Sequence, residues 1–191
     1  MKILLAFCGA TASGKTTTRA SLCGAPILIE RRKHGKYPVC TTLYKEYGLA
    51  GNVGTGSDAN IGPDIIMTAM RHCLIDRDIV IFDGVMSSPR FSELAEDFDH
   101  IIVIYFNLSL EENQRRLVQR RTKNGLAEPG LSDKTQNNLL NFRRRAETAA
   151  SRFQSYSTPS TLITVSDTCQ TEDIVAQIKE KIQLCPSTQT T

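Results

Sequence analysis

The segment ILLAFCGATASGKT, residues 3–16, decides the fold of this chain. It opens with a short, continuous apolar run, which is typical of a strand buried on both faces of a sheet. The run passes directly into a glycine loop with the pattern G-x-x-x-x-G-K-T, from Gly9 to Thr16. We expect a helix from Lys15 to about Leu22, so the loop joins a strand to a helix, which is the setting that a phosphate-binding loop requires.

The residues of this loop predict its ligand. Glycines let the backbone fold around an anion, and the loop amides and the helix N-terminus direct positive charge toward phosphates. We expect Lys15 to reach the β- and γ-phosphates of ATP and the Thr16 hydroxyl to ligate Mg²⁺. A glycine turn with a purely structural role would not require the Lys-Thr pair. The predicted ATP-binding residues of the loop are Gly9, Ala10, Thr11, Ala12, Ser13, Gly14, Lys15, Thr16 and Thr17.

Strands and helices alternate along the rest of the chain. Further apolar strands are predicted at 26–30, 79–82, 101–106 and 161–165, and helices at 63–75, 91–98, 109–123, 132–154 and from 167 or 171 to 184. Near-continuous apolar strands that alternate with helices indicate a parallel sheet covered on both faces. We predict one domain over residues 1–185, a three-layer α/β P-loop NTPase fold with a five-stranded parallel sheet, and a flexible tail at 186–191.

The composition excludes several classes of protein. Hydrophobic residues make up 40% of the chain, but no apolar run approaches the roughly 20 residues that cross a bilayer, so we expect no membrane partner. The six cysteines show no C-x-x-C spacing, which favours reduced thiols over a disulfide frame or a zinc site. We therefore expect a cytoplasmic protein. A net charge of only +3 does not by itself indicate a nucleic-acid partner.

A second acidic residue is expected at the phosphate site. Asp83 ends the apolar strand predicted at 79–82, and an acid at this position can hold Mg²⁺ directly or through water. An aspartate before a glycine, here Gly84, often only forms a turn. The glycine loop that begins at Gly9 favours the metal role.

Arginines flank a Gly/Pro loop in the second half of the chain. Two pairs lie on the helix predicted at 109–123 and a triplet on the helix predicted at 132–154; the seven are Arg115, Arg116, Arg120, Arg121, Arg143, Arg144 and Arg145. This layout resembles the lid of the nucleoside- and nucleotide-kinase group, in which arginines neutralise the transferring phosphoryl group and the lid excludes water. The chain has no Asn-Lys-x-Asp sequence, which argues against a GTPase.

The resemblance to these kinases implies roles for particular residues. It implies a lid over about 115–145 in which Arg120 and Arg121 stabilise phosphate charge. It also implies that the segment after the last predicted strand, with Asp167, holds the adenine ring of ATP.

The acceptor is expected to bind where the chain departs from this common core, at residues 31–62. Three carboxylates are candidates for the base that accepts a proton from an acceptor hydroxyl: Glu30, Asp58 and Asp83. Deoxynucleoside kinases use an acid at the position of Glu30. The glycine-dense loop around Asp58 can bring backbone close to a ligand, which favours Asp58, although a turn-forming role also fits it. The acceptor-binding residues predicted in this loop are Asn52, Gly56, Ser57 and Asp58.

A narrower resemblance rests on the run GLAGNVGTGSD at 48–58, followed by a helix and by VIFDG at 80–84. This arrangement is similar to phage-encoded P-loop kinases of thymine hypermodification, and implies a phage protein in the host cytoplasm. Those enzymes phosphorylate the hydroxymethyl group of 5-hydroxymethyluracil in DNA. The chain has Asp83-Gly84 where Glu-Gly is more readily expected, which leaves the role of this acid open.

DNA as acceptor gives the basic residues before the glycine loop a function. Arg31, Arg32 and Lys33 are expected to contact backbone phosphates, and Tyr37 offers a ring for stacking on a displaced base. The alternative for these cations is a solvated surface. A free nucleoside or nucleotide and a small metabolite hydroxyl are alternative acceptors, and a nucleotide-dependent switch without an acceptor is an alternative of another class.

Overall fold

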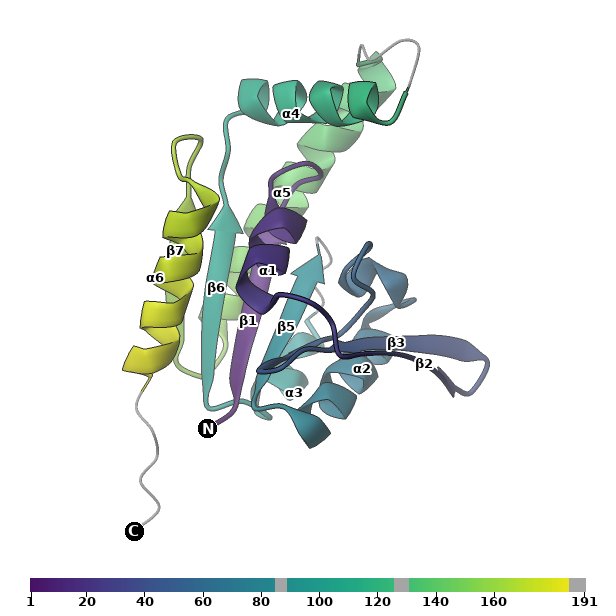
Figure 1. The fold of residues 1–191 in the computed structure, drawn as a ribbon, viewed down its shortest axis with the longest axis vertical. Helices are drawn as coiled ribbons and strands as arrows, with labels where there is room; N and C mark the ends of the chain where they lie inside the picture. The colour runs from purple at the N-terminus through teal and green to yellow at the C-terminus, as the bar shows by residue number, and fades with distance from the viewer. Residues whose placement is uncertain (85–88, 126–130, 186–191) are drawn as a thin grey trace.

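The computed structural model describes residues 1–84, 89–125 and 131–185, which form an α/β fold (Figure 1). The described residues contain a mixed seven-stranded sheet with the strand order β2-β3-β4-β5-β1-β6-β7. Its strands are β1 (Ile3–Gly9), β2 (Leu28–His34), β3 (Tyr37–Leu43), β4 (Tyr47–Leu49), β5 (Ile79–Gly84), β6 (His100–Phe106) and β7 (Ser160–Val165). The α/β class is confirmed, but the sheet has seven strands rather than five and is not wholly parallel.

Helices cover both faces of the sheet. They are α1 (Lys15–Cys23), α2 (Pro63–Asp76), α3 (Phe91–Ala95), α4 (Leu110–Lys123), α5 (Asp133–Ser155) and α6 (Thr171–Leu184), with a short 3₁₀ helix η1 (Ser57–Ala59). Alternate residues of β1 point to opposite faces. Leu4 and Ala6 pack in a core with α2, α3 and α5, whereas Ile3 and Leu5 pack in a second core with α1 and α6. Each predicted helix is present, although α3 ends at Ala95 and not at residue 98 as predicted.

The fifth parallel strand is not the one that the sequence predicts. The segment predicted at 26–30 instead begins β2, which forms an antiparallel hairpin with β3 at the edge of the sheet. Ile27, Leu28 and Ile29 remain 44–65% exposed there. The parallel neighbour of β5 on the side away from β1 is the three-residue strand β4, in a region predicted to lie outside the core sheet. A strand this short gives no apolar period. Its central residue, Gly48, lets α2 pack closely, because a Cβ atom there would lie 2.6 Å from the Cβ atom of Cys73.

Parallel pairing gathers several loops at one edge of the sheet. β5, β1, β6 and β7 run in the same direction, so their carboxyl ends lie together. The glycine loop follows β1, Asp83 ends β5, α4 follows β6, and Asp167 follows β7. Ligand sites in open α/β sheets lie at this edge. Figure 1 shows α4 lying across it.

Two parts of the chain carry predictions that lie outside the described residues. The tail predicted at 186–191 and most of the Gly/Pro loop before α5, residues 126–130, lie outside the described residues. No helix within the described ranges has both the length and the apolar composition to span a bilayer.

Candidate functional site

The backbone of the glycine loop folds back on itself after β1. Ala12 and Gly14 have positive φ angles of 61° and 104°, so the chain turns sharply before α1 begins. Gly9 is required by space, because a Cβ atom there would lie 2.5 Å from Ser13 Oγ. The loop therefore forms a tight turn between β1 and α1.

Lys15 lies inside this turn. Its ammonium donates hydrogen bonds to the carbonyl oxygens of Gly9 at 2.6 Å and Ala10 at 2.9 Å. Burial lowers the pKa of Lys15, and the carboxylates of Asp83 and Asp58 oppose this effect. The side chain is thus held at the loop, with two acids near its charge.

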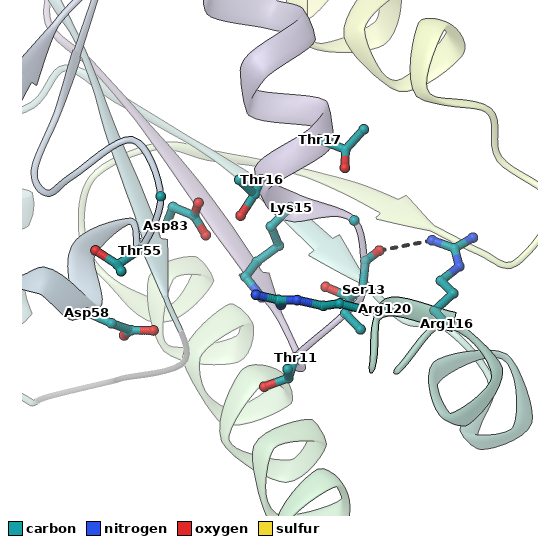
Figure 2. A pocket seen from close by; sticks show the side chains of 13 residues that line it. Thr11, Ser13, Lys15, Thr16, Thr17, Thr55, Asp58, Asp83, Arg116 and Arg120 are labelled. Carbon is teal, nitrogen blue, oxygen red and sulfur yellow. Dashed lines mark hydrogen bonds between the residues drawn. The ribbon is translucent and has the colours of Figure 1, made fainter. Parts of the chain in front are cut away.

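A cavity of about 570 Å³ opens over the loop (Figure 2). It joins the glycine loop, the segment before η1, the end of β5 and the helix α4. Its lining residues are Thr11, Ala12, Ser13, Gly14, Lys15, Thr16, Thr17, Gly54, Thr55, Asp58, Asp83, Arg116 and Arg120. Four predicted residues from separate segments, Lys15, Asp58, Asp83 and Arg120, therefore share one cavity.

The two carboxylates of the cavity differ in their surroundings. Asp83 is buried, with 4% exposure, whereas Asp58 on η1 is accessible from the cavity. Burial raises the pKa of both side chains, and Lys15 opposes this rise in both. For Asp83 the guanidinium of Arg19 opposes it as well. Asp58 is thus the carboxylate that a ligand can reach more freely.

Arg19 is a site residue that sequence reasoning missed. It lies on α1 one turn after Lys15, and its side chain is 1% exposed. One guanidinium nitrogen lies 2.9 Å from Asp83 Oδ2, and another donates to the carbonyl of Val53. The only sequence signal was its four-residue spacing from Lys15, which places both on one face of a helix.

The segment between β4 and α2 is fixed by its own backbone and by Asn60. Asn52 and Gly56 exchange backbone hydrogen bonds of 3.1 and 2.8 Å, which closes the turn. The buried Asn60 side chain accepts from the Cys40 amide at 2.7 Å and donates to the Cys40 carbonyl at 3.2 Å and the Ala50 carbonyl at 3.4 Å. Asn60 thereby attaches η1 to β3 where β4 has ended, a role that its sequence position does not reveal.

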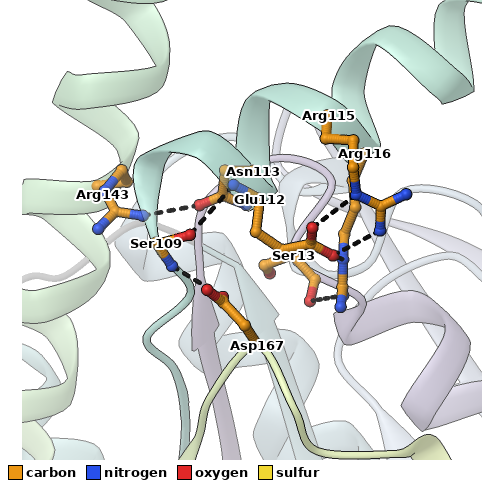
Figure 3. Close-up of polar contacts among 8 residues, drawn as sticks. All are labelled: Ser13, Ser109, Glu112, Asn113, Arg115, Arg116, Arg143 and Asp167. Carbon is orange, nitrogen blue, oxygen red and sulfur yellow. Dashed lines mark hydrogen bonds and ion pairs between the residues drawn. The ribbon is translucent and has the colours of Figure 1, made fainter.

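A second cavity of about 420 Å³ lies between α4 and the loop after β7. Asp167, predicted for adenine, lines this cavity rather than the first one. Glu112 pairs with two arginines beside the second cavity: the Nε atoms of Arg115 and Arg116 each lie 2.6 Å from the Glu112 carboxylate (Figure 3). Hydrogen bonds from these arginines lower the pKa of Glu112 to about 2. Arg116 also donates to the carbonyl of Ser13 at 3.2 Å, so it lines both cavities.

The start of α4 is capped by two acceptors. The Ser109 hydroxyl accepts from the Glu112 amide at 3.1 Å. The Ser109 amide donates to Asp167 Oδ1 at 2.8 Å, so Asp167 takes the place that a capping-box glutamate would fill. Arg143 of α5 donates to the Leu108 carbonyl and to Asn113 Oδ1, and this anchors the same end of α4 (Figure 3).

Several predicted residues lie outside the first cavity. Glu30 is on the edge strand β2, where it pairs with Arg32 at 2.8 Å, so the structure does not bring it to Lys15. Arg121 lies on α4 but does not line either cavity. The exposed cations Arg31 and Lys33 lie on the β2–β3 hairpin.

The remaining residues predicted to bind the acceptor lie in two separate parts of the structure. Tyr37 is 41% exposed near the tip of the β2–β3 hairpin, with the Lys36 ammonium 5.4 Å from its ring centroid. Asn52 and Gly56 close the turn before η1, and Ser57 begins η1; none of the three lines the first cavity.

Comparison with known proteins adds no assignment. No protein-family model matches the chain, and a search of curated proteins finds no sequence similar to it. Function is therefore inferred from the geometry of the two cavities.

Proposed function

We propose that this chain is an ATP-dependent kinase that transfers the γ-phosphoryl group to a hydroxyl acceptor. One observation carries the proposal: a single cavity holds a lysine-bearing glycine loop, two arginines from α4 and two carboxylates. The loop and cations supply positive charge for phosphates. A carboxylate across the same cavity supplies a proton acceptor for a hydroxyl. A phosphate-binding switch would not need that second group.

The second cavity fits the rest of the nucleotide. It adjoins the glycine loop through Ser13 and Gly14 and is lined by Asp167, which follows β7. With the phosphates at Lys15, the base and ribose of ATP are directed into this second cavity. Arg116, which lines both cavities, would then lie between the base and the phosphates.

Magnesium fits the donor set of the first cavity. The Thr16 hydroxyl and the Asp83 carboxylate both line it, and Mg²⁺ prefers oxygen ligands and completes its shell with water and phosphate oxygens. The described residues hold no cluster of three or more His, Cys, Asp or Glu side chains, so phosphate oxygens would have to share in binding the ion. Bound there, Mg²⁺ would neutralise charge on the phosphates.

The transfer itself follows from these positions. The acceptor oxygen attacks the γ-phosphorus in line, the bond from that phosphorus to the β,γ-bridging oxygen breaks, and ADP leaves. Lys15 and Arg120 stabilise the charge that develops on the phosphoryl oxygens. Asp58 accepts the proton of the hydroxyl, because it is the more accessible carboxylate opposite the loop.

For the acceptor we propose DNA that carries 5-hydroxymethyluracil. The support is the resemblance of residues 48–58 and 80–84 to phage kinases of this reaction, together with the exposed cations of the β2–β3 hairpin. Arg31 and Lys33 alternate with Arg32 along β2, and of the three only Arg32 is paired with Glu30. Two unpaired cations on one face suit a nucleic-acid backbone.

The test is transfer from γ-labelled ATP and Mg²⁺ to parallel acceptors. These are DNA with 5-hydroxymethyluracil, unmodified DNA, and free hydroxymethyl-deoxyuridine with its monophosphate. We expect label only in the modified DNA, kept on the base after digestion to nucleosides. Label only in the free nucleoside or nucleotide would make the chain a metabolite kinase, and ATP hydrolysis without any labelled acceptor would contradict the kinase proposal.

A further inference from the structure

The buried arginine of α1 connects both sides of the first cavity. Arg19 is charged yet 1% exposed, and burial of a guanidinium is unfavourable unless it is paired and hydrogen-bonded. Its partners come from two segments distant in sequence, Asp83 at the end of β5 and the Val53 carbonyl in the turn before η1. Arg19 itself does not line either cavity.

The turn that Arg19 holds lies directly on Asp83. A Cβ atom on Gly56 would come within 2.6 Å of the Asp83 carbonyl and 3.0 Å of its carboxyl carbon. The Asp83 amide donates to the Ser57 hydroxyl at 3.0 Å. The guanidinium thus completes a closed contact among α1, β5 and this turn.

The same turn forms the side of the cavity opposite the glycine loop, where the acceptor is proposed to bind. Gly54 and Thr55 line the cavity from within the turn, and Asp58 follows on η1. Lys15, on the other side, begins the same helix that bears Arg19. The distance between the phosphate loop and Asp58 therefore depends on where Arg19 fixes the turn.

We propose that Arg19 is a positioning residue that sets the acceptor-binding turn and Asp58 relative to the phosphate loop; this inference rests on the proposed kinase function. It acts through Val53 and Asp83 and touches no substrate. Loss of the link is expected to impair use of the acceptor while the glycine loop still binds ATP. Misplacement of reacting groups by about 1 Å can lower a rate about a hundredfold.

Arg19→Lys is the informative substitution. Lysine keeps the positive charge beside Asp83, but its single nitrogen cannot serve Asp83 and the Val53 carbonyl with the fork geometry of arginine. We expect kcat/KM for the acceptor to fall about ten- to a hundredfold, with the Kd for ATP in the absence of acceptor changed by less than about twofold. Equal losses in ATP binding and acceptor use, or no loss in either, would overturn the proposal.

Arg77→Lys is the matched control. Arg77 is half-buried and its Nε donates to the Tyr44 carbonyl at 2.7 Å, so it also ties a helix end to a backbone carbonyl, but it lines neither cavity. This variant should keep the wild-type kcat/KM for the acceptor and the wild-type Kd for ATP. A fall in acceptor use equal to that of Arg19→Lys would show a general loss of stability and overturn the positioning role.

Amide hydrogen exchange tests the link without any acceptor. In Arg19→Lys the Asn52 and Gly56 amides, which close the turn, should exchange about five- to tenfold faster, as loss of one hydrogen bond predicts. The Thr18 amide in α1 should be unchanged. Unchanged exchange in the turn would overturn the proposal. If exchange in Arg19→Lys accelerates as expected but the wild-type protein phosphorylates no acceptor, the link is upheld and the kinase function is rejected.

Discussion

Two glycine-containing turns face each other across the first cavity, and they use glycine differently. The glycine loop at 9–14 coils its backbone around the Lys15 ammonium, which leaves a cation inside a ring of backbone groups. The turn at 51–56 uses glycine to pack closely. A Cβ atom on Gly51 would lie 1.9 Å from the Gly56 carbonyl oxygen, and one on Gly56 would lie 2.6 Å from the Asp83 carbonyl oxygen. A high density of glycines therefore indicates a tightly packed backbone, and does not by itself indicate a binding site.

Lys15→Ala tests the glycine loop and should give the largest effect. It removes the cation nearest the transferring phosphoryl group, so we expect phosphate transfer to fall about a thousandfold or more. The measurement is initial rate of label transfer to the preferred acceptor. Lys45→Ala, an exposed lysine outside both cavities, is the control and should keep the wild-type rate. Transfer by Lys15→Ala at more than a tenth of the wild-type rate would reject the site.

Gly56→Ala tests the packing turn. Gly56 has a φ of 60° and its α-carbon lies against Asp83, so alanine would be strained in conformation and in space. We expect the free energy of unfolding to fall by about 2–4 kcal/mol, measured by denaturant titration. Gly54→Ala, in the same turn but with open space around its α-carbon, should stay within about 0.5 kcal/mol of wild type. Equal losses in the two variants would mean that the turn does not pack as described.

Asp58→Asn addresses the acceptor side. We expect transfer to fall about a hundredfold, because an amide cannot accept the proton of the hydroxyl. Burial raises the pKa of Asp58, so its inactive protonated form persists above the ordinary range of an aspartate. The wild-type rate should therefore decline, as pH is lowered, at a higher pH than an exposed aspartate would give. The variant should lose this acidic limb; an unchanged limb in Asp58→Asn would assign it to another group.

The smallest effect is expected at the β2–β3 hairpin. Arg31→Ala with Lys33→Ala should weaken binding of modified DNA severalfold at low salt and lower the slope of log affinity against log salt by about two. Arg32→Ala should have less effect, because Glu30 already pairs with Arg32. Fluorescence anisotropy over a salt series measures both. Identical slopes in wild type and the double variant would leave the hairpin cations as a solvated surface.

The sequence predicts the parts of this molecule that are encoded locally. The apolar strands predicted at 79–82, 101–106 and 161–165 and the glycine-lysine-threonine loop each carry a local signal, and the structure has each where it is expected. Their agreement reflects short-range physics: hydrophobic period and turn geometry. Lys15 and Asp83 share a cavity because parallel strands place their carboxyl ends together.

What the sequence does not predict depends on contacts between distant segments. The strand β4 is three residues long and is recognisable only from its pairing with β5 and β3. Arg19 reads as an ordinary helical arginine until the fold buries it against Asp83. Apolar Ile27 and Ile29 favour a core strand, yet the chain uses them at an exposed edge because β4 occupies the place next to β5.

Asn60 connects the edge hairpin to the 3₁₀ helix that bears Asp58. A single side-chain amide satisfies both backbone groups of Cys40, where a longer β4 would have formed an ordinary ladder. The hydrogen bonds of Asn60 therefore link β3 of the hairpin to the end of η1, two residues from Asp58. Any movement of the hairpin relative to the sheet must either carry η1 with it or break the hydrogen bonds of Asn60.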